Sequence, residues 1–150
     1  MEKLDERLLR EWLRIFSTVQ NIRLESKLTH NEMLVCYSLF CADRDRPGAT
    51  MTPTEIAHET KIRPSQVNRN LNQLEKREMI TRTRSATDHR RVDVSLNVEH
   101  EDPFLEERSE VLGLVDLLVE RLGRERAEQA CELLAEVSGI IESEFPLDAE

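Results

Sequence analysis

The sequence predicts a mainly α-helical fold that carries one small β-ribbon. Apolar residues recur with a helical period over most of the 150 residues, whereas strict alternation of apolar and polar residues is confined to residues 80–96. Between residues 52 and 96, two short helical patterns run directly into two alternating strands. A chain of this length can bury about 68 to 70% of its unfolded surface, so we expect one compact unit.

The first two helices are predicted upstream of that block. One long amphipathic helix is expected over residues 3–27, because its apolar residues form a stripe with helical spacing. A second helix should begin at Thr29, where Thr29 and Glu32 have the spacing of a capping box. It should stop before residues 43–48, which are charged and end in Pro47-Gly48. The stripe of the first helix consists of Leu4, Leu8, Trp12, Ile15, Phe16, Val19 and Ile22.

Two short helices follow, separated by a turn of about three residues. Thr52 and Glu55 form another capping box, with Pro53 at the first helical position. Pro64 gives the second start signal. From there Val67, Leu71 and Leu74 fall on one face of a helix, which predicts the buried side. The opposite side carries Ser65, Gln66, Arg69, Asn72, Gln73 and Lys76, which can hydrogen-bond base edges or phosphates.

The two strands should form a ribbon with one buried face. Ile80, Arg82 and Arg84 alternate with polar residues, and Val92, Val94 and Leu96 do the same after a basic connection. The tip of the ribbon, residues 87–91, carries two arginines, and a narrow minor groove attracts inserted arginine side chains. A helix-turn-helix followed by such a ribbon is a winged helix-turn-helix, which is a DNA-reading module.

The run LEKREMITRTRSATDHRRVDVSL resembles the signature of the MarR family of bacterial transcriptional regulators. The resemblance implies a dimer with one winged helix-turn-helix in each subunit, and an Asp-x-Arg element in the wing that is matched by Asp88 and Arg90. In that family the arginine enters the minor groove and the aspartate orients it, while the second helix of the motif lies in the major groove. The DNA-binding residues implied or indicated in this chain are Ser65, Gln66, Asn68, Arg69, Gln73, Arg84, Asp88, Arg90 and Arg91.

The chain departs from the family pattern on both sides of the wing. Glu78 stands where the family commonly has glycine after the recognition helix, and Leu96-Asn97-Val98-Glu99-His100 replaces the usual Leu-Thr-x-x-Gly. If Glu78 keeps the left-handed conformation of a cap glycine, the cost is up to about 1 to 2 kcal/mol.

Two further helices are expected after the wing, from Pro103 to Leu122 and beyond Gly123. Their stripes, like that of the first helix, are too apolar for a small monomer, so we predict that they pair with the same helices of a second copy. The expected organisation is therefore a single MarR-like domain over residues 1–150, with a winged helix-turn-helix at 29–99 and dimerisation helices at 1–28 and 101–146.

Charge is distributed unevenly along the chain. The formal net charge is −9, yet residues 61–92 hold nine Lys or Arg against three acids, and residues 96–150 hold four against sixteen. Since the Debye length is roughly 8 Å at physiological salt, the local basic stretch decides whether DNA is attracted. There is no run of 18 apolar residues and the N-terminus is charged, so we expect a cytoplasmic protein without membrane association.

Other chemistry has little support in the sequence, which predicts no catalytic, metal or cofactor site. His58-Glu59 begins like a zinc-protease helix, but Ile62 occupies the position of the second histidine. His89 and His100 lack metal-ligand spacing, and three cysteines without CxxC spacing argue against disulfides or a zinc ribbon. The alternative of a redox switch at Cys36 or Cys41 would need a low thiol pKa.

Two hypotheses about function follow. The first is a homodimeric, sequence-specific transcriptional regulator, most simply a repressor, that reads a pseudopalindrome and responds to a small-molecule effector in the cleft between the helices and the wing module. The effector is implied by the family only. The second is a winged-helix module that binds protein through its acidic C-terminal helices, against which the cationic wing tip speaks. No constellation of residues supports an enzyme.

Overall fold

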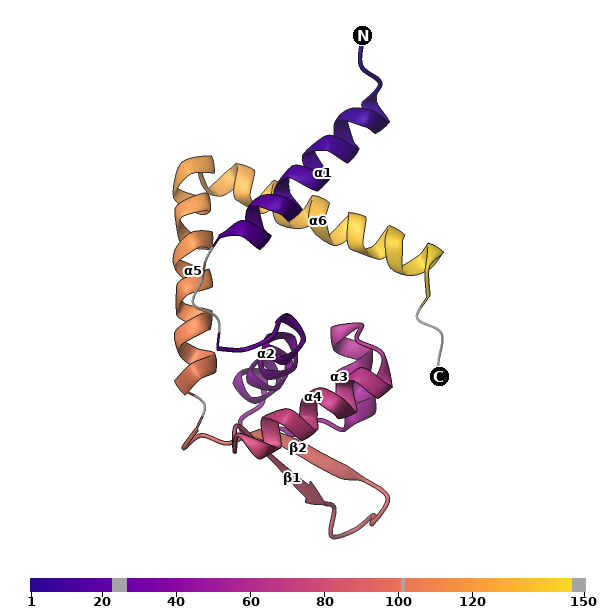
Figure 1. Ribbon diagram of the computed structural model, residues 1–150, viewed down its shortest axis with the longest axis vertical. Helices are drawn as coiled ribbons and strands as arrows, with labels where there is room; N and C mark the ends of the chain where they lie inside the picture. Colours follow the sequence, from indigo (N-terminus) through magenta and orange to yellow (C-terminus); the bar gives the residue numbers. More distant parts are fainter. Residues whose placement is uncertain (23–26, 101, 147–150) are drawn as a thin grey trace.

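The computed structural model describes residues 1–22, 27–100 and 102–146, which form six helices and one two-stranded antiparallel sheet (Figure 1). One packed unit, which we call the reading head, is formed by helices α2 (His30–Asp45), α3 (Pro53–Thr60) and α4 (Pro64–Lys76) and strands β1 (Ile80–Arg84) and β2 (Val92–Leu96). Helix α5 (Asp102–Leu122) rises from this unit, and α1 (Leu4–Asn21) and α6 (Arg124–Glu144) lie on the side away from the strands. This arrangement confirms the predicted winged helix-turn-helix with flanking helices.

Local capping determines where the helices of the reading head begin. Helix α2 (His30–Asp45) and helix α3 (Pro53–Thr60) each start at a complete capping box, formed by Thr29 with Glu32 and by Thr52 with Glu55. Helix α4 (Pro64–Lys76) starts at the predicted proline. Lys61 turns the chain between α3 and α4 with a left-handed backbone, φ +59°.

The wing is a hairpin of β1 (Ile80–Arg84) and β2 (Val92–Leu96), paired from Ile80 opposite Leu96 to Arg84 opposite Val92. Met51 adds an isolated bridge to the other edge of β2, because its backbone N–H and C=O both bond to Val94, at 3.0 and 2.8 Å. The sequence did not predict this bridge, which ties the wing to the segment before α3.

A single cluster of buried apolar side chains joins the elements of the reading head to the first turn of α5. Its largest fully buried members include residues of α2, α3, α4, β2 and α5, so the three helices of the reading head, the wing and the start of α5 share one core. The buried hydrophobic residues are Leu28, Val35, Cys36, Leu39, Ile56, Ala57, Ile62, Val67, Leu71, Leu74, Met79, Ile80, Val94 and Phe104.

The flanking helices are α1 (Leu4–Asn21), α5 (Asp102–Leu122) and α6 (Arg124–Glu144). The prediction of one helix over 3–27 was wrong at its C-terminal end: the helix stops at Asn21, Ile22 is extended, and residues 23–26 lie outside the described residues. An apolar period continues equally well through an extended residue, which explains the error. Gly123 separates α5 from α6 with φ +79°.

Large apolar side chains remain exposed along the flanking helices. Helices α1 and α6 contain no buried residue at all. Within the described residues, no helix combines the length and apolarity that a membrane span requires. Exposed apolar side chains on these helices include Leu8, Trp12, Ile15, Phe16, Val19, Leu112, Val115, Leu118, Leu133, Leu134, Ile140 and Ile141.

Candidate nucleic-acid interface

Helix α4 presents a polar, cationic face to solvent. Its buried side consists of Val67, Leu71 and Leu74, which are 0% exposed and hold the helix against the core. Five of the predicted DNA-binding residues lie on the exposed side, and within the described part of the chain their side chains make no hydrogen bond or ion pair. They are Ser65, Gln66, Asn68, Arg69 and Gln73. Amide and guanidinium groups left unpaired in this way can bond bidentately to base edges.

The tip of the wing is a tight turn that is built around Asp88. Its carboxylate accepts a hydrogen bond from the backbone N–H of Arg90 at 3.0 Å, and its carbonyl accepts one from the N–H of Arg91, also at 3.0 Å. Asp88 therefore shapes the backbone on which Arg90 stands. The Arg90 side chain is exposed and has no partner among the described residues, so its guanidinium is available to an anionic ligand.

The other two arginines predicted for the wing differ from each other. Arg84 is exposed on β1, with no hydrogen bond or ion pair from its side chain to any described residue. Arg91 instead donates from Nε to Asp93 Oδ1 at 2.7 Å, and this bond raises the pKa of Arg91 further. The side chain of Arg91 is still 45% exposed, so part of its guanidinium can reach a phosphate while Nε stays bonded to Asp93.

A contact that the sequence did not reveal joins the wing to α4. Arg82 lies on the same side of β1 as Ile80, and its Nη2 donates to Asn72 Oδ1 on α4 at 2.9 Å. Its Nε lies 3.6 Å from Glu75 Oε2, and the side chain is only 23% exposed. Asn72, which helical spacing placed on the DNA-facing side, is therefore engaged within the protein. The alternation of Arg82 with Thr81 and Thr83 was the signal that this arginine turns inward.

The two departures from the family pattern meet at the base of the wing. Glu78 has φ +57°, so the left-handed conformation is retained without a glycine. The Asn97 side-chain amide donates to the Glu78 carbonyl at 2.8 Å, and the Asn97 N–H donates to the Met79 carbonyl at 2.9 Å. His100 Nε2 lies 4.0 Å from Glu78 Oε2. Asn97 thus closes the turn that glycine usually makes.

Among the described residues, no three His, Cys, Asp or Glu side chains are grouped so as to hold a metal ion. Ile62, in the place of a second zinc-binding histidine, is buried in the core. Burial raises the pKa of the Cys36 thiol to about 12, with the Glu32 carboxylate adding to the effect. A thiol that holds its proton so firmly is a poor nucleophile, so Cys36 lacks the property that a redox switch needs.

A cavity of about 550 Å³ lies between the reading head and the end of α6. Ala57 and Ile62 contribute apolar surface from the reading head, and Ile141 and Phe145 contribute it from the other side. Lys61 and Glu142 face each other across the cavity, with Lys61 Nζ 3.8 Å from Glu142 Oε2. Its size and mixed lining are typical of sites for small organic molecules.

Comparison with known proteins supports the winged helix-turn-helix. A family model described as the MarR family matches residues 43–91, and no curated protein sequence matches the chain. Among solved structures, the chain is similar to the transcriptional repressor CouR bound to a 23-mer DNA duplex, with 26% identity, a TM-score of 0.71, and coverage of 91% of this chain and 92% of that chain.

Two ligand-related structures have the same fold. BpsR of Bordetella bronchiseptica, described with regulation of its DNA binding by 6-hydroxynicotinic acid, shows 21% identity, a TM-score of 0.67 and coverage of 91% and 94% of the two chains. NadR in complex with 4-hydroxyphenylacetate shows 24% identity, a TM-score of 0.67 and coverage of 91% and 93%.

Proposed function

We propose that this chain, whose winged helix-turn-helix region belongs to the MarR family, is a sequence-specific transcriptional repressor that binds a pseudopalindromic operator as a homodimer. The observation that carries the proposal is that the reading head exposes two surfaces, on α4 and at the wing tip, whose polar side chains have no partner among the described residues. The exposed face of α4, with Gln66 and Arg69, suits the major groove, and Arg90 at the wing tip suits the adjacent minor groove.

Charge supports the same surface. The stretch 61–92 carries a net charge of +6, although the whole chain carries −9. Five of its cations are exposed and have no side-chain partner among the described residues: Arg63, Arg69, Lys76, Arg84 and Arg90. Neutralising phosphates with such side chains releases counterions, which supplies most of the non-specific affinity for DNA. The acidic surplus lies in residues 96–150, most of which belong to α5 and α6 on the far side of the reading head (Figure 1).

The apolar surface of α1, α5 and α6 supports a homodimer through residues 1–28 and 101–146. Monomers rarely expose contiguous apolar surface on this scale, since each large apolar side chain withdrawn from water contributes about 1.5 to 3 kcal/mol. Trp12, Phe16 and Leu134 are 52, 61 and 64% exposed in the isolated chain. A twofold pairing would place two α4 helices about 34 Å apart, which is one turn of DNA.

A small aromatic acid is proposed as the effector. The cavity between the reading head and α6 offers apolar walls together with the Lys61 ammonium, which suits an aromatic ring with a carboxylate. BpsR and NadR, which share the fold, are described with hydroxylated aromatic acids. Such a ligand would change operator affinity only if it binds one separation of the two reading heads better than another.

The DNA-binding proposal is tested by titrating operator-selected and random duplexes at several salt concentrations. We expect Arg90→Ala to weaken binding and to lower the salt slope by about one counterion, or to remove the preference for narrow A·T steps. Gln66→Ala or Arg69→Ala should alter sequence preference by about 1 to 3 kcal/mol per lost bidentate contact. Arg124→Ala, which removes a cation from α6, is the matched control.

Two results would contradict the proposal. An Arg90→Ala protein with wild-type affinity and salt slope removes the wing from the interface. A wild-type preference for selected over random duplex below about 10³ favours the alternative, a module that binds protein through its acidic helices. A stable monomer at micromolar concentration would remove the twofold operator.

A further inference from the structure

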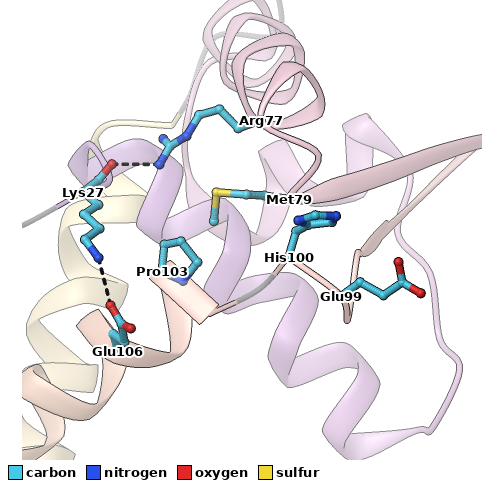
Figure 2. Close-up of a pocket in the computed structure, with 7 residues that line it drawn as sticks. All are labelled: Lys27, Arg77, Met79, Glu99, His100, Pro103 and Glu106. Atoms are coloured by element: carbon cyan, nitrogen blue, oxygen red, sulfur yellow. Dashed lines mark hydrogen bonds and ion pairs between the residues drawn. The ribbon is translucent and has the colours of Figure 1, made fainter.

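The junction between the reading head and α5 is held by one apolar and one polar contact. The segment before α2, the end of α4 and the start of α5 meet around a hollow of about 340 Å³ (Figure 2). Helix α5 is the only described element that runs directly from the wing to the proposed dimerisation helices. Whatever fixes its angle here therefore fixes the reading head relative to the rest of the dimer.

The apolar contact is a pivot. Phe104, in the first turn of α5, is 0% exposed, and its ring centroid lies 5.7 Å from that of Phe40 on α2. One turn further along, the Arg108 guanidinium stacks 4.5 Å above the same Phe40 ring. These contacts hold the near end of α5 against the core, but apolar packing is non-directional, so it does not by itself fix the angle of the helix.

The polar contact starts from Arg77, the residue that caps the C-terminus of α4. Its Nη2 donates to the Lys27 carbonyl at 3.0 Å, and its Nη1 donates to Glu32 Oε2 at 3.3 Å. Lys27 Nζ in turn donates to Glu106 Oε2 on α5 at 3.1 Å, and Figure 2 shows the two links through Lys27 in series. The end of α4, the segment before α2 and the start of α5 are thus joined by directional bonds.

The bonds in this series differ in how far they are exposed to water. The side chain of Glu32 is only 9% exposed, and the same Glu32 oxygen also accepts the Thr29 N–H at 2.9 Å. Lys27 and Glu106 are 63 and 64% exposed, and ion pairs so open to water are weak. Among the described residues the Arg77 guanidinium bonds to the segment before α2 and to α2, and the Lys27–Glu106 pair is the link in this series that reaches α5. Arg77 therefore acts on α5 by fixing the segment that carries Lys27.

We propose that Arg77 is a positioning residue that sets the tilt of α5 against the reading head, and through it the half-site spacing that the protein selects. This inference rests on the proposed homodimer. Helix α5 has 21 residues, so at 1.5 Å per residue its length is about 30 Å. A tilt of about 6° at the pivot then moves the far end by about 3 Å, close to the rise of one base pair.

The experiment compares binding to three kinds of duplex, all derived from the sequence that the wild-type protein selects from a random pool. These are the selected operator, the same operator with one base pair inserted between or removed from its half-sites, and a duplex with a single half-site. The variants are Arg77→Gln and Lys27→Met. The control is Arg46→Gln, because Arg46 is an exposed cation between α2 and α3, outside α4 and the wing, whose side chain has no partner among the described residues.

We expect the wild type and Arg46→Gln to discriminate sharply between the spacings. Arg77→Gln should reduce that discrimination by about fivefold or more, within the usual range of coupling between sites, while single half-site affinity stays unchanged. Lys27→Met, which removes the link from this segment to α5, should act in the same direction. Arg77→Lys, which keeps the charge but can serve only one of the two acceptors well, should fall between Arg77→Gln and the wild type.

Each other outcome is decisive. Equal loss of affinity on the single half-site and on the full operator would mean that Arg77 contacts DNA directly or supports only the fold, and the inference is overturned. The inference is also overturned if Arg77→Gln and Lys27→Met both discriminate between the spacings as the wild type does. Lys27→Met removes only an exposed ion pair, so its result remains informative even if Arg77→Gln folds poorly. A wild type that ignores spacing overturns the homodimeric operator proposal and this inference with it.

Discussion

Replacing Glu78 with glycine should stabilise the protein, although it removes a side chain. Glu78 has φ +57°, and a side chain in this left-handed conformation costs about 1 to 2 kcal/mol. Glycine avoids that cost but loses about 0.5 to 1 kcal/mol through its more flexible unfolded chain. The Asn97 amide bonds to the Glu78 carbonyl, which glycine retains, so this closure of the turn is unaffected.

The net gain from Glu78→Gly is therefore about 0.5 to 1 kcal/mol, because the remaining contact of the side chain, His100 at 4.0 Å, joins two exposed groups. For a chain of this size that corresponds to a rise in Tm of about 1 to 4 °C. The assay is thermal unfolding followed by circular dichroism at one fixed protein concentration, since the Tm of an oligomer depends on concentration.

Lys76→Gly provides the matched control. Lys76 is two residues earlier and is the last residue of α4, where the backbone is still helical, so glycine relieves no strain there and should cost up to about 1 kcal/mol. The two substitutions should thus shift the Tm in opposite directions. If Glu78→Gly lowers the Tm as Lys76→Gly does, the left-handed strain assigned to Glu78 is wrong.

Three further predictions follow from contacts in the reading head. Arg82→Met breaks the 2.9 Å bond to Asn72. In double-mutant cycles of DNA affinity, this change should reduce the loss caused by Arg90→Ala and leave the loss caused by Arg69→Ala as it is. An unchanged effect of Arg90→Ala would show that Arg82 does not position the wing. Phe104→Ala should cost about 3 to 5 kcal/mol in denaturant unfolding, and a cost below 1 kcal/mol would contradict its role as the pivot of α5. Burial raises the pKa of Cys36 from 9.0 to about 12, so between these pH values the folded state keeps a proton that the unfolded state releases. The free energy of unfolding should therefore fall as the pH rises through that window, by up to about 1.4 kcal/mol per pH unit relative to Cys36→Ala. Equal slopes of stability against pH for the two proteins would contradict this prediction.

Local hydrogen bonding made the helix starts of the reading head predictable. Each start signal acts within one turn of helix, so a stretch of about four residues is enough to recognise it. The signals are the capping boxes at Thr29 and Thr52 and the proline at residue 64. The buried side of α4 was equally predictable, because Val67, Leu71 and Leu74 recur at helical spacing and nothing else in the chain had to be known.

Contacts between elements could not be predicted in this way. The Met51 bridge to Val94 joins residues far apart in the sequence, and no local pattern marks Met51 as a strand residue. Helical spacing placed Asn72 with Gln66 and Arg69, but spacing does not say that β1 would bring Arg82 beside it. The bond from Arg91 to Asp93 is different, because the two residues are only two positions apart and a strand places such residues on one face, so this local contact could have been predicted.

The segment of residues 77–80, which contains the departure at Glu78, connects α4 to the wing and to the segment before α2. Arg77 joins α4 to the segment before α2, Glu78 makes the left-handed turn, and Ile80 begins the wing. A glycine at residue 78 would make the unfolded chain more flexible, but the folded turn would still be closed by the Asn97 amide, which bonds to the backbone carbonyl of residue 78. The wing angle and the tilt of α5 are thus set from adjacent residues of one chain segment. A substitution at Arg77 should change spacing selectivity, one at Arg82 should change the contribution of the wing, and the strain at Glu78 can be removed without either effect, because the glycine variant keeps the same backbone path.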